Sequence, residues 1–350
     1  YVARADFVQS SKNTIFGHIL TNKTSTWTDP ILGLPLDGQT GRTQTARQYQ
    51  TALGWTHVLN PSKLNEFRLG YLRNASRMKG FQADEDVNAK YGIPFPFAGP
   101  VVGGMAAINI SGYTGLGSPG GNPYYQFVNK YEISDSFTSI HGAHSFKFGV
   151  YSALKLFQNQ KNSNRGRGQL DFTGVFTRQV GFSNSGNAIA DFLTGVANQT
   201  RLGNVVNEKD IGKAFEWYAQ DKWQATPKLT ITVGVRYQYN PPSWEARDMI
   251  SSVLWGSGFK NAEVVVPTGQ NETTFRFMKD VLFPFVPVRR ATELSRGLVR
   301  NPNLNFAPRL GIAWQLGSKT VLRTGYGIFY GFPEQVAGSV MTVNAPTRLS

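Results

Sequence analysis

Cysteine is absent from this chain of 350 residues, and histidine occurs only four times. Without thiol groups the chain has no disulfide scaffold, no thiolate metal site and no cysteine nucleophile. No run of about 18 apolar residues occurs, which excludes a transmembrane helix. Aromatic residues make up 13% of the chain and charged residues only 17%, a composition that argues against intrinsic disorder.

The chain is rich in glycine, with 37 residues, and basic residues outnumber acidic ones by 36 to 22, a net charge of +14. Together with many Ser, Thr, Asn and Gln residues, this composition favours β structure. The positive charge suits anionic partners such as nucleic acid, lipid headgroups or lipopolysaccharide. The basic residues are scattered and form no basic helix, so we expect no nucleic-acid partner.

A period of two is the strongest local pattern. Apolar and polar residues alternate through 213–225 and 229–240, on either side of a tight turn at Thr226-Pro227-Lys228. This alternation predicts a hairpin whose strands have one apolar and one polar face. Similar hairpins are predicted within 44–74, 124–158 and 304–331.

The connections between these strands are of two kinds. Short turns alternate with long, Gly- and Pro-rich loops at roughly 23–43, 75–122 and 241–303. Outer-membrane β-barrels combine short periplasmic turns with long extracellular loops, and their strands need about 9–11 residues to cross the bilayer. A soluble β-sandwich or propeller shares the alternation, but no fixed repeat of about 40–50 residues indicates a propeller.

Several segments in order carry a family resemblance. They read HSFKFG at 144–149, AIADFLTG at 188–195, YAQDKW at 218–223 followed by TP and LTITVGVRY, NFAPRLGIAW at 305–314, TGYGIFY at 324–330 and THVLNPSKLNEFRLGY at 56–71. Together they resemble TonB-dependent outer-membrane receptors, and they are most similar to the Oar-like branch of that family.

The resemblance implies an all-β, antiparallel, up-and-down transmembrane barrel of about 22 strands around a plug domain. Such a receptor lies in the outer membrane of a Gram-negative-type bacterium and imports nutrients with energy from the TonB complex. We count about twelve strands here, including 167–176 and 196–206, and no plug. We therefore expect residues 1–350 to be part of one barrel domain. Its expected partners are outer-membrane lipid and lipopolysaccharide, the plug and remaining strands of the full protein, TonB through a missing N-terminal part, and an unknown nutrient.

The polar face supplies the first set of candidate site residues. These charged side chains would line the lumen and contact the plug, or would simply be solvated residues of the wall. They are Glu66, Arg68, Lys130, Glu132, Lys147, Lys155, Glu216, Lys222, Arg236, Arg309 and Arg323.

Aromatic residues of the long loops supply the second set. They would grip a sugar or a siderophore by stacking, or pack within their own loops. They are Trp27, Tyr113, Trp244, Trp255 and Phe259.

Two aspartates, Asp135 and Asp221, break the apolar faces of their strands near short turns. A carboxylate facing lipid is destabilising away from the interface, so we expect each to bond turn backbone or a neighbouring strand. No G-x-S-x-G or H-E-x-x-H motif is present. We therefore predict no catalytic residues, no cofactor and no metal, and a protein that is not an enzyme.

Three functions stay open from these residues. The first is a TonB-dependent receptor that binds and imports an extracellular nutrient through a plugged barrel. The second is a non-transporting surface adhesin or assembly-forming outer-membrane barrel. The third is a secreted, soluble β module that binds anionic polysaccharide.

Overall fold

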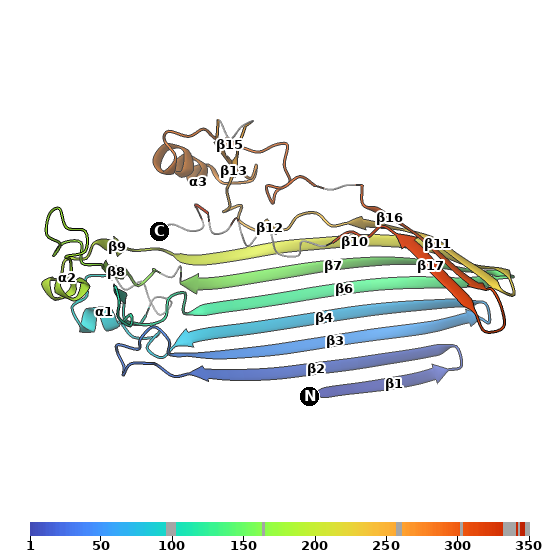
Figure 1. Ribbon diagram of the computed structural model, residues 1–350. Coiled ribbons are helices and arrows are strands. Elements are labelled where there is room, and N and C mark those ends of the chain that lie inside the picture. The colour runs from blue at the N-terminus through green and yellow to red at the C-terminus, as the bar shows by residue number, and fades with distance from the viewer. Residues whose placement is uncertain are drawn as a thin grey trace.

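One large antiparallel sheet dominates the protein (Figure 1). The computed structural model describes residues 1–95, 103–162, 165–256, 261–301, 304–331, 341 and 344–346. The strands of the large sheet are β1 (Val2–Ser10), β2 (Asn13–Thr28), β3 (Arg42–Asn60), β4 (Lys63–Gly80), β6 (Tyr124–His141), β7 (His144–Asn162), β10 (Val205–Thr226), β11 (Leu229–Tyr239), β12 (Trp244–Glu245), β16 (Phe306–Gln315) and β17 (Val321–Gly327).

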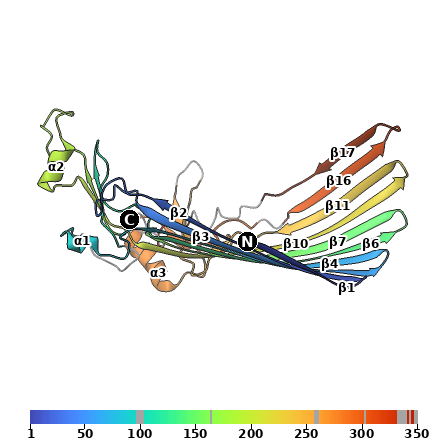
Figure 2. The ribbon, with the colours of Figure 1, turned by 90° about the horizontal axis from the view of Figure 1, so that it is seen from below.

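Each long strand pairs with the long strands that precede and follow it in sequence. The order is β1-β2-β3-β4-β6-β7-β10-β11-β16-β17, and the short β12 adds to β10. Tight turns, as at Pro61-Ser62 and Gly142-Ala143, join the strands at one end, and long connections lie at the other. Figure 2 shows that the sheet curls into an open wall with β1 and β17 at its edges. The predicted antiparallel, up-and-down arrangement is confirmed, and the sheet is not closed.

Two of the twelve predicted wall strands are wrong. Residues 167–176 and 196–206 contain only β8 (Gln169–Phe172), β9 (Gln199–Arg201) and the first residues of β10. With β5 (Ala107–Ile110), β8 and β9 form a separate sheet in the order β5-β8-β9. Strands of three or four residues cannot cross a bilayer, which needs about 9–11. The apolar residues of the alternating segment 167–176 instead pack into a small hydrophobic core in the loop region.

Several wall strands are longer than predicted and their loops correspondingly shorter, whereas β16 and β17 are shorter than the predicted 304–316 and 319–331. β2 continues to Thr28 and β4 to Gly80, so the predicted loops 23–43 and 75–122 begin too early. The added segments, such as TSTWT and NASRMKG, show no apolar and polar alternation. Beyond the lipid both faces of a strand meet water, so the period of two that reveals a strand disappears.

The long connections at one end fold into two small units. The first contains β5, β8 and β9 with α1 (Val87–Lys90) and α2 (Ala188–Thr194), and its core includes Ile108 and Phe172. The second contains β13 (Ser252–Leu254), β14 (Glu263–Val266), α3 (Glu272–Arg276), the π-helix η3 (Phe277–Leu282) and β15 (Val288–Arg290). Its core includes Val265 and Met278, which are fully buried. Within the described ranges, no helix has the length and apolarity to cross a membrane.

A buried arginine fixes part of the first unit. Arg167 donates to the carbonyl oxygen of Pro119 at 3.1 Å and also to that of Asn122. Its own carbonyl accepts from Asn88 Nδ2 at 2.9 Å. Burial lowers the pKa of Arg167 to about 10, because a low-dielectric site disfavours the charged form. The guanidinium group therefore stays charged at neutral pH. Through its side chain and its backbone carbonyl, Arg167 connects its own segment with those of Asn88 and of Pro119 and Asn122.

The two faces of the large sheet differ as the alternation predicted. Rungs of paired residues such as Leu53–Leu69–Ile133 and Ala219–Val235–Pro308 form the apolar face. Val233 on this face is 54% exposed. Large exposed apolar side chains over a whole sheet face are typical of a surface that meets lipid.

Both aspartates on the apolar face find partners on a neighbouring strand, as expected. Asp135 Oδ1 on β6 accepts from Asn65 Nδ2 on β4 at 2.9 Å. Asp221 Oδ2 on β10 lies 2.6 Å from His144 Nδ1 on β7. Both aspartates lie in the half of their strand that is nearer to the short turn.

One pair of substitutions can test which face of β11 meets lipid. We expect Val233→Arg to destabilise the folded barrel by about 2–4 kcal/mol, since it places a charge at mid-strand on the lipid face. Thr232→Arg, on the polar face one residue away, should be tolerated. Urea unfolding of the refolded protein in lipid vesicles measures both, and equal costs would show that the assigned faces are wrong.

Candidate functional site

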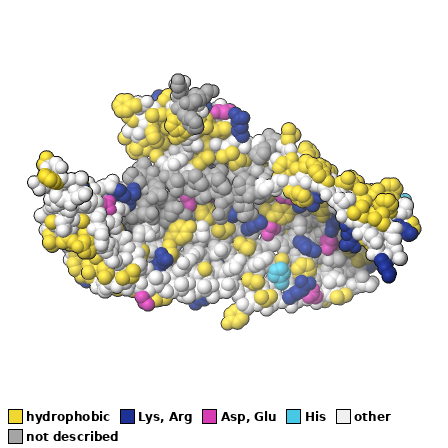
Figure 3. Space-filling view, in the orientation of Figure 1, with side chains coloured by type: hydrophobic (Ala, Val, Ile, Leu, Met, Phe, Trp, Pro, Cys, Tyr) yellow, Lys and Arg dark blue, Asp and Glu magenta, His cyan; other side chains and the backbone are white. Residues whose placement is uncertain are grey.

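The polar face of the large sheet carries a band of paired charges. All eleven predicted charges lie on this one face. The registers connect Glu66, Ser136 and Gly149 in one row of paired residues, Lys130 with Lys155 in another, and Arg309 with Gly234 in a third. Figure 3 shows Lys and Arg side chains beside Asp and Glu in the hollow of the sheet. Three carboxylates organise the band.

Glu66 on β4 is the first of these carboxylates. Its Oε1 lies 3.3 Å from Arg68 Nη2, and its Oε2 lies 3.6 Å from Lys147 Nζ on β7. The hydroxyl of Ser136 on β6, the strand between them, donates to Glu66 at 3.4 Å. One carboxylate thus spans three neighbouring strands.

Glu132 on β6 is the second carboxylate. Its Oε1 lies 3.0 Å from Lys130 Nζ and accepts from the Tyr151 hydroxyl on β7 at 2.5 Å. Gly70 lies opposite Glu132 on β4, and a Cβ there would come within 3.5 Å of the Glu132 side chain. This is an ordinary van der Waals distance, so a larger residue at this position would also leave the carboxylate in place.

Glu216 on β10 is the third and the most buried carboxylate, with 7% of its surface exposed. Its Oε2 lies 2.8 Å from Arg236 Nε on β11. This N–H does not point along the line to the oxygen, so the contact is an ion pair rather than a hydrogen bond. The Arg236 guanidinium also lies 5.7 Å from the centre of the Tyr218 ring, within the range of a cation–π contact.

Glycines let the large side chains of this face lie flat against the sheet. A Cβ at Gly149 would meet the Tyr218 ring at 2.4 Å, and one at Gly54 would meet the Phe16 ring at 2.0 Å. These ring positions exist only because the opposite residue has no side chain. The sequence pattern reveals the alternation but not these partners, which depend on the register.

Three predicted residues lie outside the paired band. Arg309 on β16 lies 4.8 Å from the centre of the Phe329 ring. Lys222 on β10 and Arg323 on β17 lie near the short turns. The structure therefore joins seven of the eleven charges through carboxylates and leaves these three apart, and Lys155 lines the cavity described next.

A cavity of about 310 Å³ opens between the polar face and the chain segments that leave β11 and enter β16. Its charged and phenolic lining residues are Lys130, Tyr151, Lys155, Lys213, Glu216, Arg300 and Tyr330. The cations outnumber the one carboxylate, which suits an anionic or hydroxyl-rich solute. Arg300 was not predicted as a site residue, because it comes from a segment without alternation. Tyr330 falls within the strand predicted up to residue 331, but β17 ends at Gly327. In the described part of the chain, no group of three or more His, Asp or Glu side chains could hold a metal ion.

The predicted loop aromatics lie on separate elements. Trp27 belongs to β2 and lies 4.4 Å from the Phe81 ring, and Trp244 belongs to β12. The placement of Trp27 in a loop is therefore wrong, because β2 runs further than the alternation shows. Trp244 does lie within the predicted loop 241–303, in a strand of only two residues. Tyr113 and Trp255 do lie in connections and are 62% and 58% exposed. Phe259 lies outside the described residues.

The fold and its two faces define the wall of an outer-membrane barrel. The sequence matches the family described as "Outer membrane beta barrel domain" over residues 1–350, and the chain belongs to this family. The protein is thus located in the outer membrane of a Gram-negative bacterium, which excludes the alternative of a soluble, secreted module. The comparison with curated proteins gives no match.

Several solved structures are similar to the chain at low identity. The outer membrane transporter YddB from Escherichia coli is 9% identical, with a TM-score of 0.42 over 93% of this chain and 39% of its own. The copper transporter OprC is 9% identical, with a TM-score of 0.45 over 98% and 40%. The siderophore receptor PiuA from Acinetobacter baumannii is 10% identical, with a TM-score of 0.44 over 93% and 41%. The chain therefore spans less than half the length of each of these proteins.

The contact between the Tyr218 ring and Gly149 can be tested by substitution. We expect Gly149→Ala to cost about 1–3 kcal/mol of unfolding free energy, since the new methyl group would overlap the ring. Gly17→Ala is the matched control, because a Cβ at Gly17 meets nothing within 4 Å. Urea unfolding in lipid vesicles compares the two. In a Tyr218→Ala background the cost of Gly149→Ala should vanish, and an unchanged cost there would contradict the contact.

Proposed function

We propose that this chain forms part of the wall of a TonB-dependent outer-membrane receptor of the Oar-like branch, which binds and imports an extracellular nutrient. The observation that carries the proposal is the band of paired charges on the polar face. Glu66, Glu132 and Glu216 form ion pairs with Lys and Arg side chains of the same face. Such a wall suits a wide, hydrated lumen that contains a globular plug, and not a small barrel filled by apolar side chains.

The open edges of the sheet support the same proposal. Backbone N–H and C=O groups cannot be left unpaired in lipid, so β1 and β17 each require a further strand. In the proposed receptor these strands, the plug and the segment that contacts TonB belong to the rest of the full protein. Together with the order of the quoted motifs, this requirement favours a large barrel of which the chain is one part.

We infer that binding, and not catalysis, is the task of the polar face. The cavity beside Lys130 and Lys155 offers cations at the long-loop end, where a solute would arrive. Positive potential in a concave site concentrates anions and raises their rate of binding. The proposed nutrient is therefore anionic or rich in oxygen acceptors, and no step of the proposal requires a resident cofactor or metal.

The import function can be tested without knowing the nutrient. Cells that lack this protein and cells that lack TonB are grown beside wild-type cells, and loss of each solute from the medium is followed by mass spectrometry. We expect at least one solute to remain in both mutant cultures and to be consumed by the wild type. If both mutants consume every solute normally and only the first loses attachment to surfaces, the adhesin alternative is correct.

A charge-removing variant then tests the cavity. Lys130→Gln with Lys155→Gln should slow uptake of that solute by about tenfold, because two charge-assisted contacts are lost. Lys222→Gln, on the same face near the short turns, is the control and should leave uptake close to that of the wild type. Equal uptake by all three proteins would contradict a binding role for the cavity.

A further inference from the structure

β12, a strand of only two residues, joins the connection between β11 and β16 to the wall. It pairs with the long-loop half of β10, where Asp210 lies opposite Glu245 and Ile211 lies opposite Trp244. Figure 1 shows β12 beside β10, between the long strands and the second unit. We name residues 244–247 the strap, because they hold the start of this long connection against the wall.

Three hydrogen bonds extend the pairing of the strap. The Ala246 amide donates to the Lys209 carbonyl oxygen at 2.7 Å, and the Arg247 guanidinium donates to the Asn207 carbonyl oxygen. The Lys209 amide donates to Oε1 of Glu245 at 3.3 Å. So short an antiparallel pair is marginally stable by itself. The charges beside the strap therefore have a large influence on whether it stays on β10.

Three buried carboxyl groups lie beside the strap. Glu208 and Asp210 are two residues apart on one face of β10, and Glu245 lies opposite Asp210. Their exposed fractions are 1%, 6% and 0%. Like charges directly opposite each other are destabilising, and the repulsion grows where burial lowers the dielectric constant. The pairing of β12 with β10 therefore carries an electrostatic cost whenever all three groups are ionised.

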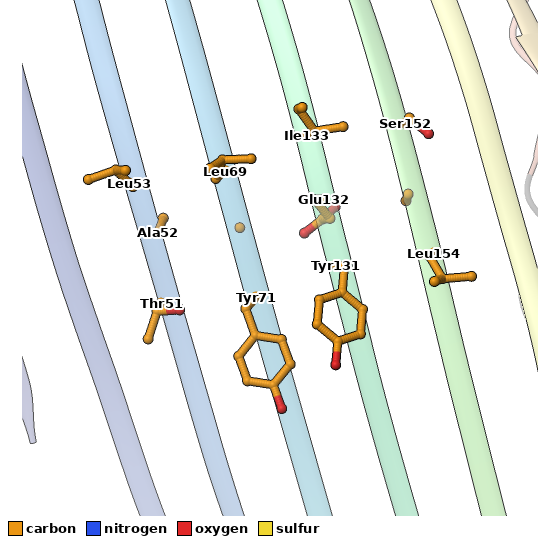
Figure 4. A pocket seen from close by; sticks show the side chains of 12 residues that line it. Thr51, Ala52, Leu53, Leu69, Tyr71, Tyr131, Glu132, Ile133, Ser152 and Leu154 are labelled. Carbon is orange, nitrogen blue, oxygen red and sulfur yellow. The ribbon is translucent and has the colours of Figure 1, made fainter.

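The three carboxyl groups lie on the polar face, outside the membrane. The registers connect Glu132 with Ala153 and Ala153 with Ala214, and Asp210 is an even number of residues from Ala214 on β10. Figure 4 shows Glu132 on the opposite side of the ribbon from Leu69. Asp210 is sixteen residues from the short-turn end of β10, beyond the about 9–11 residues that cross the bilayer. The strap therefore lies at the extracellular end of the lumen wall.

The carboxyl groups of Glu245 and Asp210 differ in their partners. Oε2 of Glu245 accepts from the amides of Arg247 at 2.8 Å and Met249 at 3.0 Å, and Oε1 accepts from Nε of Arg247 at 3.2 Å. The oxygens of Glu245 are thus turned toward the chain that follows β12. Oδ1 of Asp210 is buried and accepts no hydrogen bond from the described residues. Asp210 is therefore the member of the cluster that lacks a stabilising contact.

The charged and titratable groups around Asp210 come from four strands and the loop segments after β12. They are Glu208 on its own strand, Lys155 on β7, Tyr124 on β6, Glu245 on β12, and Arg247, Asp248 and Arg296 in the loop segments. Arg247 is paired with Glu245 at 3.2 Å, and Arg296 with Asp248 at 2.6 Å. Burial, and after it the charges of Glu208 and Glu245, raise the pKa of Asp210 to about 7. The neutral carboxyl group is thus the form that the attached strap favours.

The strap also bounds the cavity beside Lys130 and Lys155. Pro241, Pro242 and Ser243, which directly precede β12, line this cavity. Because these three residues continue into the strap, its release from β10 would move one side of the cavity.

We propose that the strap is a proton-controlled closure of this cavity, which stays on β10 while Asp210 is protonated and is released when ionised Asp210 is repelled by Glu208 and Glu245. That the closure admits a solute rests on the proposed function, whereas the release of the strap does not. The attached strap holds its proton more tightly than the released one. Attachment is therefore strongest in acid and weakens as the pH rises from about 4, the ordinary pKa of aspartate, to about 7. At higher pH it changes no further.

Hydrogen exchange of the full protein in lipid nanodiscs tests the release of the strap. Mass spectrometry follows peptides that contain residues 244–249, and each rate is divided by the intrinsic exchange rate at that pH. We expect the protection of these amides to fall at least about tenfold between about pH 5 and pH 8. Peptides of β6 are the internal reference and should keep their protection. Strap protection that stays constant or rises over this range would overturn the proposal.

Three variants identify the titrating group. Asp210→Asn keeps the size and removes the charge, so its strap should be as protected at the higher pH as that of the wild type at the lower pH. Glu208→Gln should move the midpoint to lower pH, because a neighbouring negative charge is lost. Asp135→Asn, at the other end of the wall, is the matched control and should respond like the wild type. If Asp210→Asn keeps the wild-type response, the assignment to Asp210 is wrong.

Uptake of the solute identified above tests the link to the cavity. The wild type and Asp210→Asn are compared at the same pH, so that effects of pH on the energy supply cancel. At the higher pH we expect severalfold slower uptake by Asp210→Asn, because its strap stays closed, and at the lower pH equal uptake. Equal uptake at both, with a strap that responds in hydrogen exchange, would show that the strap does not close the cavity. If the wild type imports no solute, the proposed function fails, and hydrogen exchange alone still decides whether the strap is released.

Discussion

The hydrogen-bonding needs of backbone groups in lipid govern this structure. No water is available in the hydrocarbon core, so each strand must pair on both sides. The chain meets this need with the simplest order, in which every long strand pairs with its neighbours in sequence from β1 to β17. Tight turns at one end make such pairing local, and the register of each hairpin then follows from its turn.

That register determines what the polar face can do. A shift of one residue in any hairpin would turn Glu66, Glu132 or Glu216 toward lipid, where a charge is costly. Held in register, each carboxylate reaches a cation on its own or a neighbouring strand. Glycines opposite large side chains, as at Gly149 and Tyr218, complete the fit. The same alternation that hides the backbone from lipid thus builds a rigid, charged inner surface.

Much of this could be predicted from the sequence, and the failures share one physical cause. Alternation marks a strand only where its two sides meet different media. It therefore located the hairpins around 60–63 and 226–229, and it assigned all eleven charged residues to one face. Beyond the lipid both sides are hydrated, so the upper parts of β2 and β4 and the placement of Trp27 were missed. Residues 167–176 also alternate, but around the core of Phe172 in a loop unit, and alternation alone does not reveal which medium surrounds a segment.

The ion pairs of the polar face also could not be predicted from the sequence, but for a different reason. Glu66 and Lys147 are 81 positions apart and lie on strands that are not paired with each other. Their contact depends on two successive registers, β4 with β6 and β6 with β7, which no single pattern records. The lipid-facing side of β4 shows the opposite situation, because Arg73 and Arg77 stand on this one strand at even spacing and continue the alternation of Leu69 and Tyr71. A change from apolar to basic along one parity of one strand marks the level at which the membrane ends. Sequence therefore gives the depth of a residue more directly than its partners.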